Sequence, residues 1–276
     1  MDFRKYLEKY ARQLNEEVDK ILQQQINKAS ETDQKLVPLL KAFAKVCQGG
    51  KRIRGALVGL GYQLAGGQSK EIIKIGAALE IVHAGVLVHD DIIDQSLLRR
   101  NQPSLHQALG GDHYGVSQAI SLADYSFFLG VQIISEANFP QDFKLKALKL
   151  FSEVMKETAW GEMLDLEETD PFIIMKLKTA RYTIAGPFMI GAILAGAESE
   201  LLKRLEEFGE NLGVAFQIQD DILDSEIDYL GDLTTARAKA NEYKIRALKV
   251  LTAVTKEEKM SKILQQLAVY LVERDK

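Results

Sequence analysis

Helical periodicity runs along most of the chain and limits its fold more than any other feature. The segments LLKRLEEFGENLGVAFQIQDDILD (201–224) and KIRALKVLTAVTKEEKMSKILQQLAVYLVER (244–274) place apolar residues at i, i+3 and i+4. The 276 residues include only five prolines, and the sequence offers neither a convincing alternating strand nor an Asn-Gly or Asp-Gly hairpin signal. We therefore predict an all-α protein.

The composition is that of an ordinary globular protein, with 46% hydrophobic and 27% charged residues. No linker divides the chain, so we predict a single domain over residues 1–276. A formal charge of −4 gives no general affinity for nucleic acid. Cys47 is the sole cysteine, which excludes an intrachain disulfide and fits a reducing cytoplasm. No signal peptide is visible, and the longest uncharged run (183–197) is shorter than the ~20 residues that span a bilayer.

An acidic cluster occurs twice, as HDDIID at 89–94 and as QDDILD at 219–224. Each cluster ends an apolar stretch, so we expect each near the end of a helix with a buried face. The spacing i, i+1, i+4 then crowds three carboxylates at one helix end, where they repel and require a cation. The six residues are Asp90, Asp91, Asp94, Asp220, Asp221 and Asp224. Mg²⁺ prefers such oxygens together with phosphate, and the duplication favours this interpretation over two solvated helix ends.

Basic residues gather in three places that suit the phosphates of a metal-bound substrate. They are GGKRIR (49–54), the arginine pair after the first acidic cluster, and KLKTARYT (176–183). The basic residues are Lys51, Arg52, Arg54, Arg99, Arg100, Lys178 and Arg181. Glycine lets backbone approach an anion closely, arginine offers bidentate geometry, and lysine offers a point charge. One such group is usually a solvated surface, but three together favour phosphate binding.

These motifs carry a family resemblance. GGKRIR, HAGVLVHDDIIDQSLLRR, KTARYT and FQIQDDILD occur in the order found in the trans-isoprenyl diphosphate synthases, also called polyprenyl synthetases. The chain resembles that family from about residue 45 to 224 and again in LQQLAVYLVERD (264–275), and GGDHYGVSQAISLADYSFF (110–128) is most similar to the geranylgeranyl type from bacteria and archaea. The resemblance implies the isoprenoid synthase type I fold, a helical bundle around a deep central cavity, usually in a homodimer.

The resemblance also implies an activity, the trans, 1′-4 condensation of isopentenyl diphosphate with an allylic diphosphate, and a set of residue roles. About three Mg²⁺ ions per site would be held by Asp90, Asp91, Asp94 and Asp220, with Asp221 and Asp224 in support. The allylic diphosphate would bind Arg99 and Lys178. Isopentenyl diphosphate would bind Lys51, Arg54, His83 and Arg100, while the reacting end would be lined by Thr179, Phe216 and Gln217. His89 has no such role and is interpreted as structural.

Product length should depend on what blocks the cavity below the first cluster. Gly85 and Val86 lie one helical turn before Asp90, where short-product relatives carry aromatic residues. Their small size predicts an open floor, and therefore geranylgeranyl diphosphate or a longer product. Tyr125, Phe127 and Phe128 could close the cavity lower down, but ordinary core packing explains them equally well.

The chain departs from the family in two connections. DDILDSEIDYLGDLTTARAKANEYK (220–244) omits a glycine-lysine loop and a lysine-bearing stretch, and the link from DLEETDP (165–171) to KLKTA is also short. Gly55 stands in place of the family's usual proline, and Ala123 in place of its usual glycine. Three alternatives stay open: a non-catalytic or modulatory subunit of a heteromeric synthase, a class I terpene cyclase, which needs neither GGKRIR nor a second cluster, and a helical scaffold protein.

Overall fold

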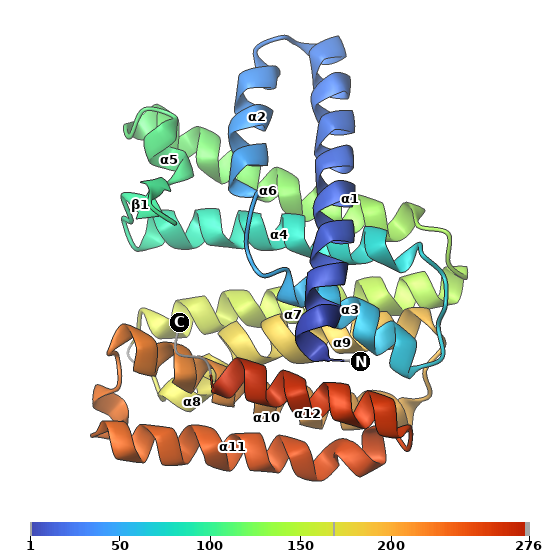
Figure 1. The fold of residues 1–276 in the computed structure, drawn as a ribbon. Helices are drawn as coiled ribbons and strands as arrows, with labels where there is room; N and C mark the ends of the chain where they lie inside the picture. Colours follow the sequence, from blue (N-terminus) through green and yellow to red (C-terminus); the bar gives the residue numbers. More distant parts are fainter. Residues whose placement is uncertain (1, 168, 274–276) are drawn as a thin grey trace. The chain divides into compact units, whose positions relative to one another are not determined.

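The computed structural model describes residues 2–167 and 169–273, so Glu168 of the DLEETDP segment and the end of LQQLAVYLVERD lie outside the described residues. Nearly all of its regular structure is helical, which confirms the all-α prediction (Figure 1). Contacts within the chain define two compact units. Unit 1 contains Met1–Glu8, Ala56–Ile72 and Phe139–Lys276, and unit 2 contains Lys9–Gly55 and Ile73–Asn138. The single domain stays a prediction.

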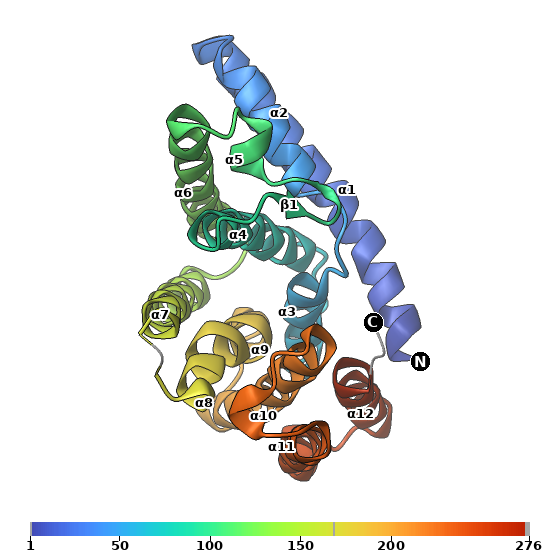
Figure 2. The same ribbon diagram turned by 90° about the vertical axis from the view of Figure 1, so that its left-hand side faces the viewer.

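Unit 2 carries the first acidic cluster and the GGKRIR segment. Its elements are most of α1 (Phe3–Thr32), α2 (Leu36–Val46), α4 (Ile72–Ile93), β1 (Leu98–Arg99), β2 (Gln102–Pro103), α5 (Leu105–Ala108) and α6 (His113–Glu136). Helices α4 and α6 lie side by side (Figures 1 and 2). They approach closely at Gly130, where an added Cβ would lie 2.4 Å from Val82 Cγ2. This contact fixes the helix that ends in the acidic cluster.

A two-residue hairpin joins β1 to β2 and corrects the expectation of no strands. Arg99 pairs with Gln102, while Arg100 and Asn101 between them have φ values of 53° and 61°. Positive φ at both central residues is the geometry of a type I′ turn, for which asparagine is well suited and arginine is not. The sequence lacked the usual glycine, so its pattern did not predict the turn. The hairpin nevertheless sets the direction of Arg99.

Unit 1 carries the second acidic cluster and the KLKTARYT segment. Its elements are most of α3 (Ile53–Leu64), α7 (Gln141–Asp165), α8 (Pro171–Ile174), η1 (Met175–Ala185), α9 (Gly186–Leu194), α10 (Ser199–Asp224), η2 (Asp228–Leu230), α11 (Leu233–Val254) and α12 (Glu258–Val272). Figure 2 shows α10, α11 and α12 as neighbours in this unit. In its core, the fully buried Phe188 and Phe208 rings meet edge to face at 5.9 Å.

The segment η1 is a π-helix of 11 residues and carries Lys178 and Thr179. Glycines on both neighbours let it sit close to them. An added Cβ on Gly161 of α7 would lie 2.6 Å from the Lys178 amide nitrogen, and one on Gly213 of α10 would lie 2.4 Å from Ala180 Cα. Helices of the π type are rare and frequent at functional sites. No feature of the sequence predicted this one.

Within residues 2–167 and 169–273, one helix, α4, is long and apolar enough to cross a membrane by length and composition alone. Its apolar window is 67% buried within the protein, as expected for a core helix. The sole cysteine, Cys47, is also buried, and this burial raises its pKa to about 12.

Candidate active site

The first acidic cluster lies at the C-terminal end of α4, as the sequence predicted. Arg99 from the hairpin pairs with two of its carboxylates. Arg99 Nη2 lies 2.9 Å from Asp90 Oδ2, and Arg99 Nε donates to Asp91 Oδ1 at 2.8 Å. Asp91 is only 2% exposed, and Asp94 follows the helix at the surface. The expected counter-cation is therefore present in this cluster.

The second cluster lies at the end of α10, and here neutral groups bind the buried carboxylate. Gln217 Nε2 donates to Asp221 Oδ1 at 2.8 Å, and the Tyr229 hydroxyl donates to Asp221 Oδ2 at 2.6 Å. Burial raises the pKa of Asp221, although both hydrogen bonds act in the opposite direction. For this residue the structure shows two neutral donors, and its supporting role at a metal ion stays a prediction.

The two acidic clusters, which repeat in the sequence, are also followed by the same backbone geometry. Gln95 and Ser225 both have positive φ, 53° and 65°, immediately after the two clusters. The next amide nitrogen then bonds back to a cluster carbonyl, Ser96 to Asp91 and Glu226 to Asp221, both at 2.8 Å. This is the same helix-ending motif in both places. Carboxylates at a helix C-terminus oppose the helix dipole, so helix stability is not the reason for either cluster.

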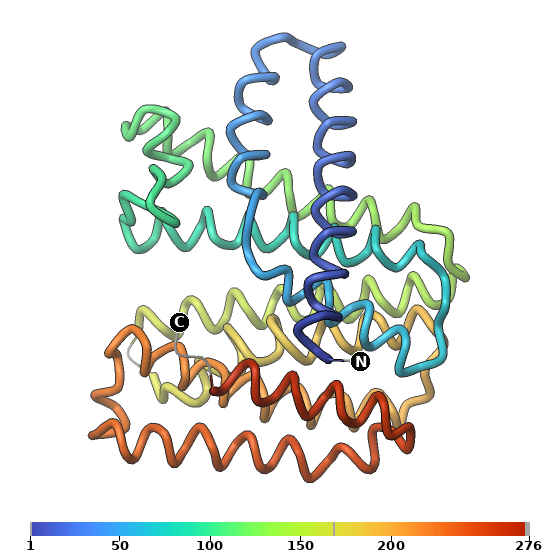
Figure 3. Tube along the Cα trace, in the orientation of Figure 1, coloured from blue at the N-terminus to red at the C-terminus, as the bar shows by residue number. Residues whose placement is uncertain are grey.

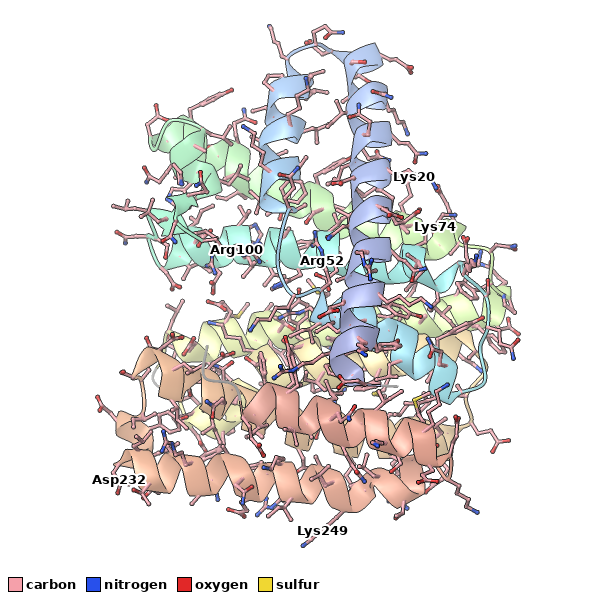
Figure 4. All side chains as sticks on the ribbon, in the orientation of Figure 1. Lys20, Arg52, Lys74, Arg100, Asp232 and Lys249 are labelled. Atoms are coloured by element: carbon pink, nitrogen blue, oxygen red, sulfur yellow. The ribbon has the colours of Figure 1, made fainter. Side chains whose placement is uncertain are left out.

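Four residues predicted to bind isopentenyl diphosphate line one cavity of unit 2. The cavity has a volume of about 70 Å³ and its lining includes Lys51, Arg54, His83 and Arg100. Gly50, with φ 84°, lets the chain pass beside Arg100, since an added Cβ would lie 3.0 Å from Arg100 Nη2. Arg100, which is labelled in Figure 4, also donates from Nη1 to the Gln48 carbonyl at 2.9 Å. The structure thus brings the predicted residues together from three segments.

The electrostatic environment of this cavity favours an anion. Burial, followed by the charges of Arg54 and Arg100, holds the pKa of His83 well below its usual 6.5. His83 is therefore neutral at physiological pH, where it offers one N–H donor. The neighbouring histidine, His89, packs its ring against Phe127 at 5.4 Å, which agrees with a structural role.

Arg52 differs from the other basic residues of GGKRIR, because it points into the protein and is 6% exposed. Arg52 Nη2 donates to the Cys47 carbonyl at 2.6 Å, Nε donates to Asn15 Oδ1 at 2.7 Å, and Nη1 lies 3.6 Å from Glu80 Oε2. Arg52 also lines the cavity, but its guanidinium is already engaged by protein groups, and its phosphate role stays a prediction. Its charge serves a buried ion pair that fixes the start of the segment.

Gly55 closes the other end of this segment and explains the missing proline. Its backbone nitrogen donates to Glu80 Oε1 at 2.8 Å, a bond that proline cannot make. An added Cβ would also lie 2.8 Å from Leu14 Cδ1 and 3.0 Å from the Gly76 carbonyl oxygen. Residues 47–55 are therefore anchored at both ends by one buried pair.

In unit 1, the two predicted cations of KLKTARYT have different surroundings. Arg181 is enclosed by Glu157 at 2.5 Å, Glu206 at 2.6 Å and Glu210 at 2.9 Å, so its charge is offset within the protein and its phosphate role stays a prediction. Lys178, which is more exposed, pairs with two carboxylates of α7, Asp165 at 2.7 Å and Glu162 at 2.9 Å.

The remaining predicted residues of unit 1 lie together near the end of α10. Thr179 Oγ1 donates to Gln217 Oε1 at 2.8 Å, which joins η1 to α10. Phe216, Asp220 and Asp224 lie on α10 beside Gln217 and Asp221. Sequence reasoning missed Tyr229, because it lies in the short connection after α10 and its only signal was a lone aromatic residue.

The residues predicted to set product length are not equivalent. An added Cβ on Gly85 would lie 2.0 Å from Ser126 Oγ on α6, so close helix packing requires the glycine. Val86 is half-buried and carries no such constraint. Of the aromatic residues on α6, Phe128 is 74% exposed, and the Tyr125 hydroxyl donates to Gln25 Oε1 at 3.0 Å.

The chemistry of the donor set fits Mg²⁺. Among the residues that the structure describes, no three acidic, histidine or cysteine side chains form a ready-made metal cage. Mg²⁺ does not require one, because it is usually held by one or two carboxylates together with substrate phosphates and water. Each acidic cluster offers such carboxylates.

The polyprenyl synthetase family model matches residues 37–267. The chain is 33% identical over 223 residues to a geranylgeranyl diphosphate synthase of Sulfolobus acidocaldarius, covering 76% of this chain and 66% of that protein. It is 36% identical over 194 residues to a geranylfarnesyl diphosphate synthase of Methanosarcina mazei, covering 67% and 62%. The match thus spans less than two thirds of either relative.

Solved structures show the same fold. A geranylgeranyl pyrophosphate synthase of Corynebacterium glutamicum, crystallised with isoprenyl diphosphate and magnesium, covers 99% of this chain and all (100%) of its own, with a TM-score of 0.86 and 20% identity. A geranyltransferase of Helicobacter pylori covers 86% and 88%, with a TM-score of 0.75 and 27% identity. The isoprenoid synthase type I fold is thereby confirmed, and the chain belongs to the polyprenyl synthetase family.

Proposed function

We propose that this protein is a trans-prenyltransferase that condenses isopentenyl diphosphate with an allylic diphosphate to give geranylgeranyl diphosphate or a longer product. The observation that carries the proposal is the convergence of Lys51, Arg54, His83 and Arg100 on one cavity of the unit whose helix α4 ends in an acidic cluster. The cavity and the cluster provide separate groups for two diphosphates. The names of the relatives support the same reaction class.

The cavity side chains would bind the diphosphate of isopentenyl diphosphate. Lys51 and the two arginines supply charge, and neutral His83 supplies a hydrogen-bond donor without adding a fourth charge. Because residues 47–55 are fixed at both ends, Lys51 and Arg54 are oriented before the substrate arrives. Side chains that are already oriented bind a substrate without the free-energy cost of reorganising at each turnover.

The allylic diphosphate would bind at the acidic clusters. Bound Mg²⁺ supplies neutralisation of the charge on the departing diphosphate, and the C. glutamicum complex supports its use. By the family resemblance, the carboxylates that would hold it are those of Asp90, Asp91, Asp94 and Asp220, with Asp221 and Asp224 in support. Arg99 and Lys178 would bind the phosphate oxygens after exchanging their present carboxylate partners for the substrate.

The reaction needs no protein nucleophile. The allylic C–O bond breaks and its electron pair leaves with the diphosphate, while the double bond of isopentenyl diphosphate attacks the allylic carbon. The resulting cation loses a proton, for which the released diphosphate is the proposed acceptor. Side chains of the chain therefore act by binding, orienting and excluding water.

The test combines a product assay with one variant pair. Purified chain is incubated with Mg²⁺, labelled isopentenyl diphosphate and an allylic diphosphate of five, ten or fifteen carbons, and the products are separated by length. Lys51→Met should raise the KM for isopentenyl diphosphate by about 10-fold to 100-fold, through loss of a charged contact, and leave the allylic KM unchanged. Lys41→Met, an exposed lysine on α2, is the matched control.

The outcomes separate the alternatives. A chain that forms no condensed product but binds isopentenyl diphosphate would support the modulatory subunit, and restored turnover on adding an active relative would confirm it. Cyclised hydrocarbon from an allylic diphosphate alone would support a terpene cyclase. A homodimer, which the resemblance implies, and a cytoplasmic location, which the single cysteine favours, stay proposals.

A further inference from the structure

A chain of hydrogen bonds begins at Tyr229, a residue to which no role has been assigned, and runs through Asp221 of the second acidic cluster. The Tyr229 hydroxyl donates to Asp221 Oδ2 at 2.6 Å, and Gln217 Nε2 donates to Asp221 Oδ1 at 2.8 Å. Gln217 Oε1 in turn accepts from Thr179 Oγ1 at 2.8 Å. Four side chains from η2, α10 and η1 are therefore linked within unit 1.

Tyr229 lies in the short connection between α10 and α11. Figure 3 shows the chain leaving α10 and entering α11 after one turn. That turn is η2, and the connection ends at Asp232, which caps α11 by accepting from the Thr235 amide (Figure 4). Because the connection is so short, Tyr229 is held within reach of the end of the helix that carries Asp221.

The Tyr229 ring is held in place by a cluster of aromatic residues. It meets the Phe172 ring edge to face at 6.3 Å, and Phe172 stacks on Tyr243 at 6.0 Å. Lys239 Nζ lies 5.7 Å from the Phe172 ring centre and 5.6 Å from that of Tyr243. Phe172 follows the other short connection of the chain, so both shortened connections contribute to this cluster. The hydroxyl is thus aimed at Asp221 by packing.

Both oxygens of Asp221 are engaged, and the residue is 8% exposed. Asp91, at the matching place in the first cluster, pairs instead with Arg99. The two clusters share sequence and helix ending but differ in what holds the buried carboxylate. Without the Tyr229 hydroxyl, Asp221 Oδ2 would lose its hydrogen-bond donor although Asp221 is largely buried. The carboxylate would then no longer be held in its present orientation.

We propose that Tyr229 is a positioning residue of the allylic diphosphate site. Its hydroxyl fixes Asp221, and Asp221 fixes the Gln217 amide between itself and Thr179. In that arrangement Asp221 is an anchor for the substrate-binding side chains, while Asp220 and Asp224 on the same helix supply the metal-binding carboxylates. This role rests on the proposed function and deepens it.

The test is Tyr229→Phe, which deletes the hydroxyl and keeps the ring. Binding of the unreactive thio analogue of geranyl diphosphate is measured by calorimetry with Mg²⁺ present, and the KM for isopentenyl diphosphate is measured in parallel. We expect the dissociation constant of the analogue to rise about tenfold, the size expected for a lost hydrogen bond to a charged group. The KM for isopentenyl diphosphate should stay unchanged, because its predicted cavity lies in unit 2.

Two further variants distinguish positioning from general stability. Tyr243→Phe removes a hydroxyl from the same aromatic cluster and should leave analogue binding unchanged. Phe172→Leu keeps the Tyr229 hydroxyl but removes the ring against it, and should weaken analogue binding by about two- to fivefold, less than loss of the bond itself. Circular dichroism and the unfolding temperature verify that each variant is folded.

Analogue binding by Tyr229→Phe that equals or exceeds that of an active wild-type chain would overturn the positioning role while leaving the proposed function intact. A lower unfolding temperature with unchanged binding would show a purely structural bond, and would overturn it as well. A wild-type chain that neither binds the analogue nor forms product would overturn the proposed function, and the role of Tyr229 with it.

Discussion

The buried pair of Arg52 and Glu80 leads to the most quantitative prediction. Their side chains are 6% and 5% exposed, and Glu80 both faces the guanidinium and accepts from the Gly55 amide. Glu80→Ala removes the acceptor and leaves the arginine charge buried without a counter-ion. Loss of one partner of a buried pair costs about 3–5 kcal/mol, and an unsatisfied buried amide about 1–3 kcal/mol. Because the two effects overlap, we expect Glu80→Ala to lower the free energy of unfolding by about 4 kcal/mol.

The assay is urea unfolding followed by far-ultraviolet circular dichroism. Glu80→Gln is the matched control for the amide, because its side-chain oxygen can still accept from Gly55 while the charge is lost. The double variant Arg52→Met with Glu80→Leu removes both charges, and should cost less than Glu80→Ala because pairs of this kind are often replaced by apolar residues at little cost. A loss below about 1 kcal/mol for Glu80→Ala would refute the argument that the pair is buried and dependent on its partner.

This pair also links stability to the candidate site. Arg52 binds the Cys47 carbonyl and Glu80 binds the Gly55 amide, so the pair anchors both ends of the segment that carries Lys51. Glu80→Ala, which removes the acceptor of the Gly55 amide, should therefore raise the KM for isopentenyl diphosphate more than the KM for the allylic substrate. Equal effects on both substrates would show that the loss of stability is general.

Three further predictions follow from single contacts. Gly85→Val should lower the free energy of unfolding by about 1–3 kcal/mol, because the new Cβ would lie 2.0 Å from Ser126 Oγ. Adding Ser126→Ala to this variant should restore part of the lost unfolding temperature. Because the pKa of His83 is lowered in the folded chain, the unfolded chain binds one more proton below pH 6.5, and the free energy of unfolding should fall by about 1 kcal/mol per pH unit there. The urea midpoints at pH 7 and pH 5.5 should therefore differ less in His83→Gln than in the wild type. Equal differences in the two proteins would contradict this prediction. Arg181→Met leaves Glu157 and Glu206 without their cation, while Glu210 keeps Lys176 at 3.0 Å. This change should lower the free energy of unfolding by about 3–5 kcal/mol at pH 7 and by less at pH 4, whereas Lys178→Met, at a more exposed pair, should lower it by less than about 1 kcal/mol; similar losses in urea unfolding would contradict the difference in burial.

The sequence by itself determined the helical class, the two acidic helix ends and the family. Apolar spacing records which face of a helix is buried, and the repeated Asp-Asp-x-x-Asp spacing places carboxylates together wherever a helix carries it. The cavity group of Lys51, Arg54, His83 and Arg100 was expected only through the resemblance, because no local pattern joins segments so far apart. The structure then placed all four on one cavity.

Only the tertiary structure decided which of these charged residues have another task. Arg52 and Arg181 look like ordinary basic residues of their motifs in the sequence, yet packing pairs the buried Arg52 with Glu80 and encloses Arg181 with three glutamates. The bond from Thr179 to Gln217 joins residues 38 positions apart, and Gly85 is small because of a serine on another helix. Such partners are chosen when helices pack, since charge and size act over a few ångströms in space and have no fixed separation along the chain.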